Sequence, residues 1–376
     1  MATYELQLQT ADGASTLAML GGPGTDTAGV LALSYTRAVG TVGALTVTLP
    51  PSLPLAFLPR DGRLLVSRSL PGVPPALDMD AVWFIVGVTR QLAETGAQAT
   101  IVHAVDAVDL LRRRIVAYAA GSSEAVKSGA ADDVMKAIVR ENLSSSATTA
   151  SRVLPAALFR VAGNLGAGPS VAKAFSRRRV LDVLREIADT ATQAGTYLAF
   201  DVVWTGATLE FRTYTQWRGV DHRFPSGFNP VILSPDTGSL TRVSYRVDYA
   251  DEVTYAYAGG QGEGDARAVG TATDTARATL SPFARIEAWV DARNTDNSTA
   301  LADEADAAVR AGRPRVVFEG AVNADAPGAT YGRDYRFGDV VTAQAFGVSV
   351  DCRIDAVSVD VTGDAERVNI LARSVA

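Results

Sequence analysis

Residues that build metal sites and disulfides are scarce in this sequence. Its 376 residues include one cysteine, Cys352, and two histidines, His103 and His222. A single cysteine excludes an intrachain disulfide and a thiolate zinc site, and two histidines leave few ligands for a multi-histidine metal centre. We therefore expect no metal and no cofactor, and we interpret Cys352 as a core thiol and both histidines as structural.

Long hydrophobic runs and an excess of positive charge are also missing. The longest apolar run, Ala81–Val88, is far shorter than the roughly 20 residues of a membrane span, and Met1–Thr10 lacks the basic and apolar regions of a signal peptide. The balance of 35 Lys+Arg against 41 Asp+Glu gives a net charge of −6. This charge argues against a basic face that grips duplex nucleic acid. We expect a soluble protein, made in a reducing compartment, with no membrane segment.

Short apolar segments bounded by turn residues dominate both ends of the chain. Such segments, rich in valine, threonine and aromatic residues, are typical of β-strands. Near the N-terminus they are Leu31–Tyr35, Ala44–Leu49, Leu64–Ser67, Val82–Thr89 and Ala99–Val105. Strands are predicted again after residue 231, and the last three are Val340–Ala345, Ser349–Val361 and Arg367–Ala372. We predict one antiparallel β unit over residues 1–110 and a second over residues 231–376.

The residues between these units, 111–230, have the pattern of an α+β insertion. Helical spacing predicts helices over Asp106–Val116, over Ala131–Leu143, and from a Ser176 cap to about Ala194. A hairpin of Tyr197–Trp204 and Thr208–Thr213 follows. A small helical insert near residues 296–312, capped by Ser298 and ended by Gly312, interrupts the second β unit. The predicted fold class is α+β and mostly β.

The two predicted β units contain similar sequence patterns. Asp61-Gly62 and the strand after it precede Phe84–Thr89, and Gly338-Asp339 with its strand precede Arg353–Ser358. Each set reads as a turn, a strand, a loop and a second apolar strand. This pattern indicates two related barrels around an insertion.

Several groups invite a catalytic or ligand-binding interpretation, and each has a simpler one. The glycine-rich segment Gly259–Gly264 leads into a predicted strand, so we interpret it as a hairpin tip, because a phosphate loop leads into a helix. His103 and Asp106 are three apart on a strand and so point to opposite faces. Paired carboxylates of the kind that glycosidases use occur in two places, Asp251-Glu252 and the Asp303, Glu304, Asp306 group. We interpret both as solvated surface acids.

The most specific segment is Tyr331–Val341, with the sequence YGRDYRFGDVV. Gly332 and Gly338 supply backbone freedom for two close turns, and Asp334 or Asp339 can accept hydrogen bonds from turn amides. Tyr331 and Tyr335 are expected to anchor the loop by packing while their hydroxyls stay in water. Val340 then begins a strand. These residue types build architecture and do not point to catalysis.

This segment resembles the Y-G-x-D-Y-x-x-G-D-x-V signature of siphophage tail hub proteins, also called baseplate hub or tail-tip proteins. These are related to the hubs of contractile tails and to type VI secretion spikes. The similarity extends back through Arg285–Arg293, Glu252–Tyr255 and the helices near residues 134–143 and 180–200. The first hundred residues agree only in pattern. The order of these segments carries the resemblance, and no single one does.

The resemblance implies two tail-tube-like barrels per chain and a homotrimer with pseudo-sixfold symmetry, which joins a hexameric tail tube to a threefold tip. Its partners would be the tail tube or distal tail protein and a spike, tape-measure or fibre protein, with phage DNA passing through transiently. The protein would be a virion component at the distal end of the tail and not an enzyme. An acidic or neutral channel would then let DNA pass without adhering.

Two other functions remain open from the sequence. A tail-associated cell-wall or polysaccharide hydrolase would use Asp251 and Glu252 or the Asp303 group. A receptor-binding tail module would grip a host glycan on an aromatic platform, for which Trp204, Trp217 and Trp289 are too scattered along the sequence.

Overall fold

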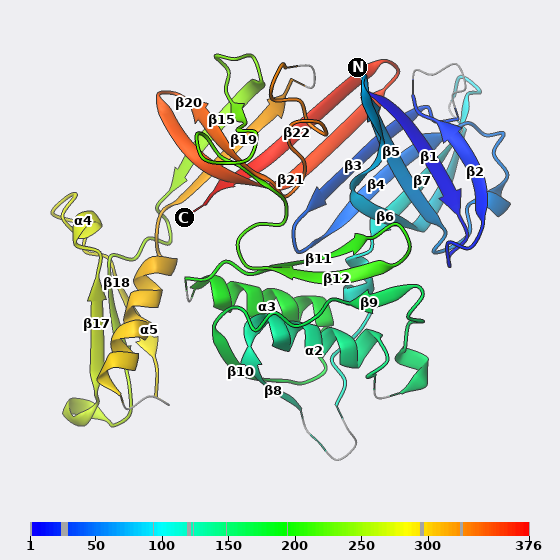
Figure 1. Cartoon of the computed structure of the whole chain (residues 1–376). Coiled ribbons are helices and arrows are strands. Elements are labelled where there is room, and N and C mark those ends of the chain that lie inside the picture. The colour runs from blue at the N-terminus through cyan, green and yellow to red at the C-terminus, as the bar shows by residue number, and fades with distance from the viewer. Residues whose placement is uncertain are drawn as a thin grey trace.

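The computed structural model describes residues 2–23, 29–92, 94–118, 122, 124–147, 149–193, 195–293, 297–323 and 326–375. Its largest element is a 14-stranded, mostly antiparallel sheet, the main sheet, which contains strands from both ends of the chain (Figure 1). The first β half supplies β1 (Thr3–Gln9), β2 (Thr16–Gly21), β3 (Ala32–Ala38), β4 (Thr41–Leu49), β5 (Arg63–Leu70), β6 (Val73–Leu92) and β7 (Gln98–Asp106). A 3-10 turn, η1 (Leu55–Phe57), lies between β4 and β5.

The second β half supplies the remaining strands of the main sheet. They are β13 (Asp221–His222), β14 (Ile232–Leu233), β15 (Leu240–Asp248), β19 (Arg315–Val322), β20 (Val340–Ala345), β21 (Val348–Thr362) and β22 (Ala365–Ser374). The predicted N-terminal strands and the last three predicted strands are confirmed within a few residues at their ends, except that β6 begins nine residues before the predicted Val82–Thr89. Alternate residues of these strands point inward, and one core contains residues of both halves, among them Tyr35, Trp83, Phe318 and Cys352.

The two halves repeat the same strand order. The order β3-β4-β7-β6 in the first half corresponds to β15-β19-β22-β21 in the second, and the two sets are adjacent in the sheet. In the first half Asp61 N donates to Ile85 O and Ile85 N donates to Gly62 O; in the second, Gly338 N donates to Ile354 O and Ile354 N donates to Asp339 O. A register shift follows each isoleucine. The turn-and-strand repeat predicted from the sequence is therefore confirmed at the level of hydrogen bonding.

The halves are joined by antiparallel pairing of β21 with β3. The paired residues run from Ala356 opposite Ala38 to Thr362 opposite Ala32. We call this pairing the internal seam. It makes one continuous sheet from segments that are more than 300 residues apart in the sequence.

Residues 107–218 form a middle layer under the main sheet (Figure 1). Its elements are α1 (Asp109–Arg112), β8 (Ala125–Ala130), α2 (Ala131–Leu143), η2 (Ala150–Arg152), β9 (Phe159–Val161), β10 (Ser170–Phe175), α3 (Val180–Gln193), β11 (Ala199–Trp204) and β12 (Leu209–Tyr214). A second core forms where α2 and α3 pack together, and it includes Val82 and Phe84 of β6. The predicted α2 helix and the β11–β12 hairpin are confirmed.

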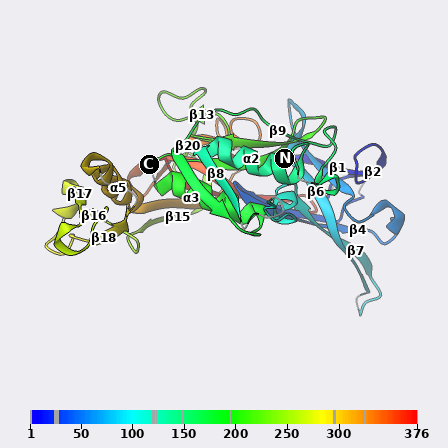
Figure 2. The same cartoon turned by 90° about the horizontal axis from the view of Figure 1, so that it is seen from below.

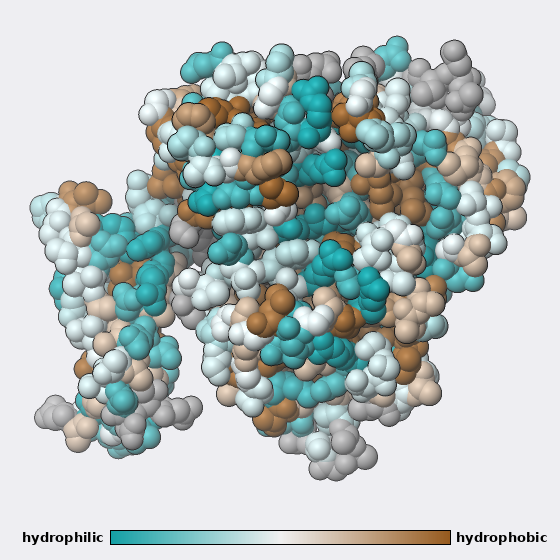
Figure 3. Space-filling model, viewed as in Figure 1, coloured by the Kyte–Doolittle hydropathy of each residue, from teal (hydrophilic) through white to brown (hydrophobic). Residues whose placement is uncertain are grey.

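A small lobe, residues 253–312, is inserted between β15 and β19 and projects to one side of the molecule (Figures 1 and 3). It contains β16 (Tyr255–Gly259), η3 (Gly264–Ala266), β17 (Val269–Thr273), α4 (Thr275–Ala278), β18 (Glu287–Asp291) and α5 (Ser298–Ala311). Its core is separate from the other two and contains Ala256, Ala258, Leu301, Ala305 and Val309.

Three helix boundaries differ from the prediction. The helix expected over Asp106–Val116 is confined to α1, because Asp106 still belongs to β7 and Ile115 forms a bridge with Arg179. The helix α3 begins at Val180 and not near Ser176. The N-cap of α5 is Asn297, whose side chain accepts from Thr299 N at 2.8 Å, and not Ser298. Among the described residues, no helix combines the length and apolarity needed to cross a membrane.

Candidate functional site: a buried network around residues 330–339

The signature loop, residues 330–339, is built by two glycines and two aspartates. Gly332 and Gly338 have φ angles of +86° and +90°, which side-chain-bearing residues rarely adopt. Asp334 accepts from Thr330 N at 2.8 Å, and Asp339 accepts from Arg336 N at 2.7 Å and from Val220 N at 2.6 Å. The expected bonding of the aspartates to turn amides is therefore observed.

The two tyrosines of the loop lie inside the core, and the expectation that their hydroxyls stay in water is wrong. Both side chains are 1% exposed, and their rings meet edge to face with centroids 5.8 Å apart. Tyr331 donates to Asp78 Oδ1 at 3.1 Å, whereas the Tyr335 hydroxyl has no hydrogen-bond partner among the described residues. The loop folds inward because it sits between the two β halves, where both rings are covered.

A buried ion pair fastens the loop to the first β half. Arg68 of β5 pairs with Glu366 of β22, with Nε 2.8 Å from Oε1 and Nη2 3.2 Å from Oε2. Its Nη1 donates to Tyr331 O at 2.7 Å, and the guanidinium lies over the Tyr331 ring at 5.3 Å. Such bidentate pairs fix geometry as well as charge. Strands from both halves and the loop are thus held by one arginine.

Asp78 of β6 completes this first cluster. It accepts hydrogen bonds from Tyr35 at 2.6 Å and from Tyr331. Burial raises the pKa of Asp78, although these hydrogen bonds and the charge of Arg68 oppose the shift. Met79 and Asp80 follow with φ of +55° and +49°, an unusual pair of left-handed residues that turns β6 toward a second cluster.

The second cluster joins the first β half to the middle layer. Arg37 of β3 pairs with Asp106 of β7 at 3.1 Å and with Asp201 of β11 at 2.6 Å, and it also donates to Met79 O. Arg218 pairs with the other oxygen of Asp201 at 2.7 Å. Burial raises the pKa of Asp106 to about 6; the charge of Asp201 adds to this shift and Arg37 opposes it.

Phe337 of the signature loop lies against both arginines of this cluster. The Arg218 and Arg37 guanidinium carbons are 4.8 and 5.5 Å from its ring centroid. A Cβ atom on Gly338 would come within 2.7 Å of the Arg218 side chain. The loop therefore contacts the arginines that connect the main sheet to the middle layer.

His222 lies beside Asp339 at the end of the loop and has a structural position. It is 8% exposed, its Nδ1 contacts the carbonyl oxygens of Phe228 and Asn229, and its Nε2 is 3.6 Å from Asp339 Oδ2. Burial raises the pKa of Asp339, while the backbone hydrogen bonds from Val220 and Arg336 oppose the shift. Cys352 is fully buried, as predicted.

The other candidate groups are not brought together as a catalytic site. His103 is exposed on β7, whereas Asp106 is buried with Arg37. Glu252 pairs with Arg277 at 3.2 Å, Asp306 pairs with Arg310 at 2.6 Å, and Asp303 and Glu304 point to solvent. The Gly259–Gly264 segment joins the antiparallel strands β16 and β17, as a hairpin tip does. Within the described ranges, no group of three His, Cys, Asp or Glu side chains could hold a metal ion.

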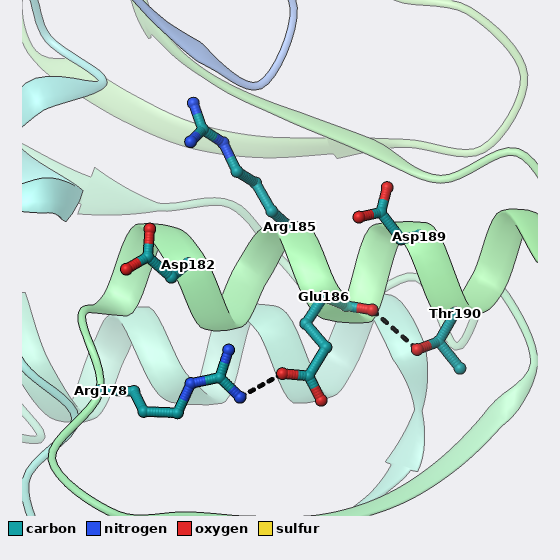
Figure 4. Close-up of a pocket in the computed structure, with 6 residues that line it drawn as sticks. All are labelled: Arg178, Asp182, Arg185, Glu186, Asp189 and Thr190. Atoms are coloured by element: carbon teal, nitrogen blue, oxygen red, sulfur yellow. Dashed lines mark hydrogen bonds and ion pairs between the residues drawn. The ribbon is translucent and has the colours of Figure 1, made fainter.

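An open depression on α3 is lined only by polar and charged side chains (Figure 4). Arg178 and Glu186 form an ion pair there, and Thr190 donates to the Glu186 carbonyl oxygen. Arg185 points away from this pair and donates to Gly40 O, in the turn between β3 and β4, at 3.1 Å. The Arg178–Glu186 pair lies within the depression, whereas Arg185 helps to attach the middle layer to the main sheet.

Sequence reasoning missed Arg37, Arg68, Asp78, Asp201 and Glu366. One signal was present: arginine continues the inward-facing series Leu33, Tyr35, Arg37 on β3 and Leu64, Val66, Arg68 on β5. A charged residue in a core-facing register predicts a buried partner. The partners themselves are up to 298 residues away and left no local trace.

Comparisons with known proteins agree with this architecture. The model of the family described as Siphovirus ReqiPepy6 Gp37-like protein matches residues 28–371. No curated protein sequence matches the chain.

Three solved structures share the fold at low sequence identity. The 43 kDa tail protein of prophage MuSo2 from Shewanella oneidensis has a TM-score of 0.60 at 10% identity, over 99% of this chain and 98% of that one. The tail protein from Neisseria meningitidis MC58 has a TM-score of 0.59 at 12% identity, over 99% and 96%. A chain of the Francisella PdpA-VgrG complex has a TM-score of 0.55 at 11% identity and covers all of this chain but 53% of its own length.

Proposed function

Because the chain belongs to the Siphovirus ReqiPepy6 Gp37-like protein family and has the fold of phage tail proteins, we propose that it is the structural hub of the tail tip. Three copies form a ring that joins the hexameric tail tube to a threefold tip and provides the channel for DNA ejection. The ring lies at the distal end of the tail, between the tail tube or distal tail protein and a spike, tape-measure or fibre protein. The protein is not an enzyme.

The internal repeat is the observation that carries this proposal. Residues 1–110 and 231–376 act as two related, tube-like barrels, with residues 111–230 as the insertion and a helical insert near 296–312. Because the two β halves have the same strand order and are joined side by side at the internal seam, three chains present six equivalent β units. A threefold ring can then match a sixfold tube.

The same repeat supports a specific contact between chains. In the internal seam, the part of β21 after Ile354 pairs with β3. The equivalent part of β6, after Ile85, and the equivalent of β3, which is β15, are each paired on one side only within the described structure. The β6–β7 hairpin extends beyond the rest of the sheet (Figure 2). We infer that β6 of one chain pairs with β15 of the next, and we call this contact the external seam.

The register of the external seam follows from the internal one. Asp360 lies opposite Ser34, and their side chains are hydrogen-bonded at 2.6 Å. The pairing of each strand with its neighbours makes Gln91 equivalent to Asp360 and Ser244 equivalent to Ser34. Gln91 of one chain should therefore lie opposite Ser244 of the next.

The channel surface would be the face of the sheet opposite the core. In the first β half this face carries Ser34, Thr36, Thr46, Thr48, Thr89 and Gln91. In the second half Glu319 and Asp360 accompany Arg246, Arg367 and Arg373. Hydroxyl and amide groups with both signs of charge suit a surface that DNA passes without being held.

Cysteine cross-linking tests the ring. The variant Gln91→Cys with Ser244→Cys should form a disulfide-linked trimer on mild oxidation, because paired residues on adjacent strands bring cysteines within bonding range. The matched control Leu92→Cys with Ser244→Cys places the two thiols on opposite faces and should cross-link far less. Absence of covalent trimer in the first variant, with sedimentation showing a stable dimer, would contradict the proposal.

The hydrolase alternative has its own test. Zymography on peptidoglycan and host polysaccharide should show no clearing for the purified chain. Clearing that Glu252→Gln or Asp303→Asn abolishes would replace the structural hub by a tail-associated hydrolase.

A further inference from the structure

The small lobe has an inverted side-chain pattern. On β16 the residues facing its helix α5 are Ala256 and Ala258, which are fully buried, while Tyr255 and Tyr257 point to the opposite face. On β18 Ala288 faces the helix and Trp289 points away. An ordinary two-layer unit places its largest apolar side chains between the layers. In this lobe the largest side chains lie on the outer face of the sheet, so packing in the core of the lobe does not account for their presence.

Small residues on the inner face let α5 approach closely. A Cβ atom on Gly270 of β17 would come within 2.4 Å of the backbone of α5 at Leu301. The buried core of the lobe contains no aromatic side chain among the described residues. The outward aromatic residues are therefore available for another contact.

The outward residues form one continuous surface, which we call the aromatic face: Tyr255, Tyr257 and Trp289. The two tyrosine rings are 4.8 Å apart, and Trp289 is the direct strand partner of Tyr257. Trp289 is 55% exposed, and its indole lies over Gly259, where a Cβ atom would clash at 2.3 Å. The lobe's sheet thus brings Trp289 together with two tyrosines, whereas Trp204 and Trp217 lie in the middle layer.

Charged side chains surround the aromatic face and neutralise each other. Arg285 pairs with Glu287 and Arg267 pairs with Asp291, each at 2.6 Å. The same arginines lie over Tyr255 at 3.9 Å and over Trp289 at 5.1 Å. An aromatic centre with arginine and a charge-balanced polar rim is the composition of protein–protein interfaces. A surface for a polyanion would instead carry one sign of charge.

The aromatic face points away from its own chain. The helix α5 covers the inner face of the lobe's sheet and contacts α3 of the middle layer, where Arg310 lies against Gly195. From the body outward, Figure 1 shows the middle layer, α5 and the lobe's sheet. The aromatic face lies on the side of this sheet opposite α5.

The external seam determines what lies beyond this face. The lobe is inserted between β15 and β19, and β15 is the strand that the next chain would join. The middle layer of each chain lies under the main sheet (Figure 1), and its core includes Leu65, Val82 and Phe84 of its own first β half. In the ring, the first β half of the next chain follows β15, and its middle layer comes next to the lobe.

We propose that the aromatic face is a second contact between neighbouring chains, in which the lobe of one copy packs on the middle layer of the next. This inference rests on the proposed ring and continues its external seam. Each lobe is then held on both sides, by α3 of its own chain through α5 and by the next chain through Trp289 and the two tyrosines.

The test uses the full chain with the Gln91→Cys and Ser244→Cys pair as the parent. Trp289→Glu should raise the protein concentration needed for half-maximal cross-linking at least about tenfold, because it buries a carboxylate in the contact. Phe283→Glu is the matched control: Phe283 is 88% exposed, precedes β18 in the same lobe and is not one of the three residues of the aromatic face. It should stay within about twofold of the parent. Trp289→Phe should retain most of the cross-linking, and circular dichroism should show that all variants are folded.

The outcomes separate this inference from the ring itself. If the parent forms no covalent trimer, the ring is wrong and this contact falls with it. If the parent cross-links and Trp289→Glu cross-links equally well, the ring stands and the contact is wrong. If neutral oligosaccharides then change the Trp289 fluorescence, the aromatic face is a glycan platform, which also overturns the contact between chains.

Discussion

At the residue scale, the signature loop contains two neighbouring tyrosines whose environments differ in one respect. Both rings are buried, but only the Tyr331 hydroxyl has a hydrogen-bond partner, Asp78. Removal of a bonded hydroxyl leaves a buried acceptor without one of its donors, whereas removal of an unpartnered hydroxyl relieves a desolvation cost. The two substitutions to phenylalanine are therefore a matched pair.

We expect Tyr331→Phe to lower the free energy of unfolding by about 1–3 kcal/mol, and Tyr335→Phe to leave it within about 0.5 kcal/mol or to raise it. Urea denaturation followed by tryptophan fluorescence measures both. Equal losses in the two variants would show that packing, and not the Asp78 hydrogen bond, governs this site.

The raised pKa of Asp106 predicts that the free energy of unfolding falls as the pH rises, which is unusual for an ion-paired carboxylate. Burial raises its pKa from the ordinary value of 3.8 to about 6 in the folded protein, so the folded state holds this proton more tightly. The stabilisation from this bound proton is complete below the ordinary pKa of 3.8 and is lost as the pH rises through about 6. Asp106→Asn should remove a decline of roughly 1–3 kcal/mol in the unfolding free energy between about pH 4 and 7.

The measurement is a set of urea denaturations over this pH range, with Asp303→Asn as the control for an exposed carboxylate. The control should follow the wild-type curve. A wild-type curve that is parallel to that of Asp106→Asn would mean that Asp106 titrates at its ordinary pKa.

At the element scale, α5 depends on glycine in the strand beneath it. Gly270→Ala places a methyl group against the backbone of α5, and overpacking of this kind typically costs about 1–3 kcal/mol. We expect faster hydrogen exchange in α5 and β17, with α2 and α3 unchanged. Gly163→Ala is the control, because a Cβ atom there meets nothing within 4 Å. Equal exchange in both variants would show that α5 shifts without cost.

Strands and helices were largely predictable because their signals are local. Ala131–Leu143 has its boundaries where the apolar spacing placed them, and the match of Phe84–Thr89 with Arg353–Ser358 is the alignment that the hydrogen bonds show. The prediction of a helix over Asp106–Val116 was wrong at its start, because Asp106 is held by Arg37, which is 69 residues away in the sequence. The prediction that the Tyr331 hydroxyl stays in water was wrong for the same reason, since its partner Asp78 is 253 residues away in the sequence. Both features depend on partners that are distant in the sequence, and the spacing of residues along the chain does not predict such contacts.

At the scale of the whole molecule, the small lobe is an insertion with a core of its own. Its core shares no residue with the other two cores. It leaves and rejoins the sheet at one point, because Asp248 at the end of β15 lies directly opposite Arg315 at the start of β19. A two-residue turn can join antiparallel strands at such a position.

We therefore expect a variant in which Asn-Gly replaces residues 249–314 to fold with the main sheet and middle layer intact. Circular dichroism should retain the β signal with less helix, and thermal unfolding should stay cooperative, because the main contact that the body loses is that of α5 with α3. With the cysteines at 91 and 244 added, this variant should still form the disulfide-linked trimer at high concentration, since both strands of the external seam remain. It should need more protein to do so than the full-length parent, because the aromatic face is gone. An aggregated or unfolded product would mean that the lobe is part of the folding unit of the second β half.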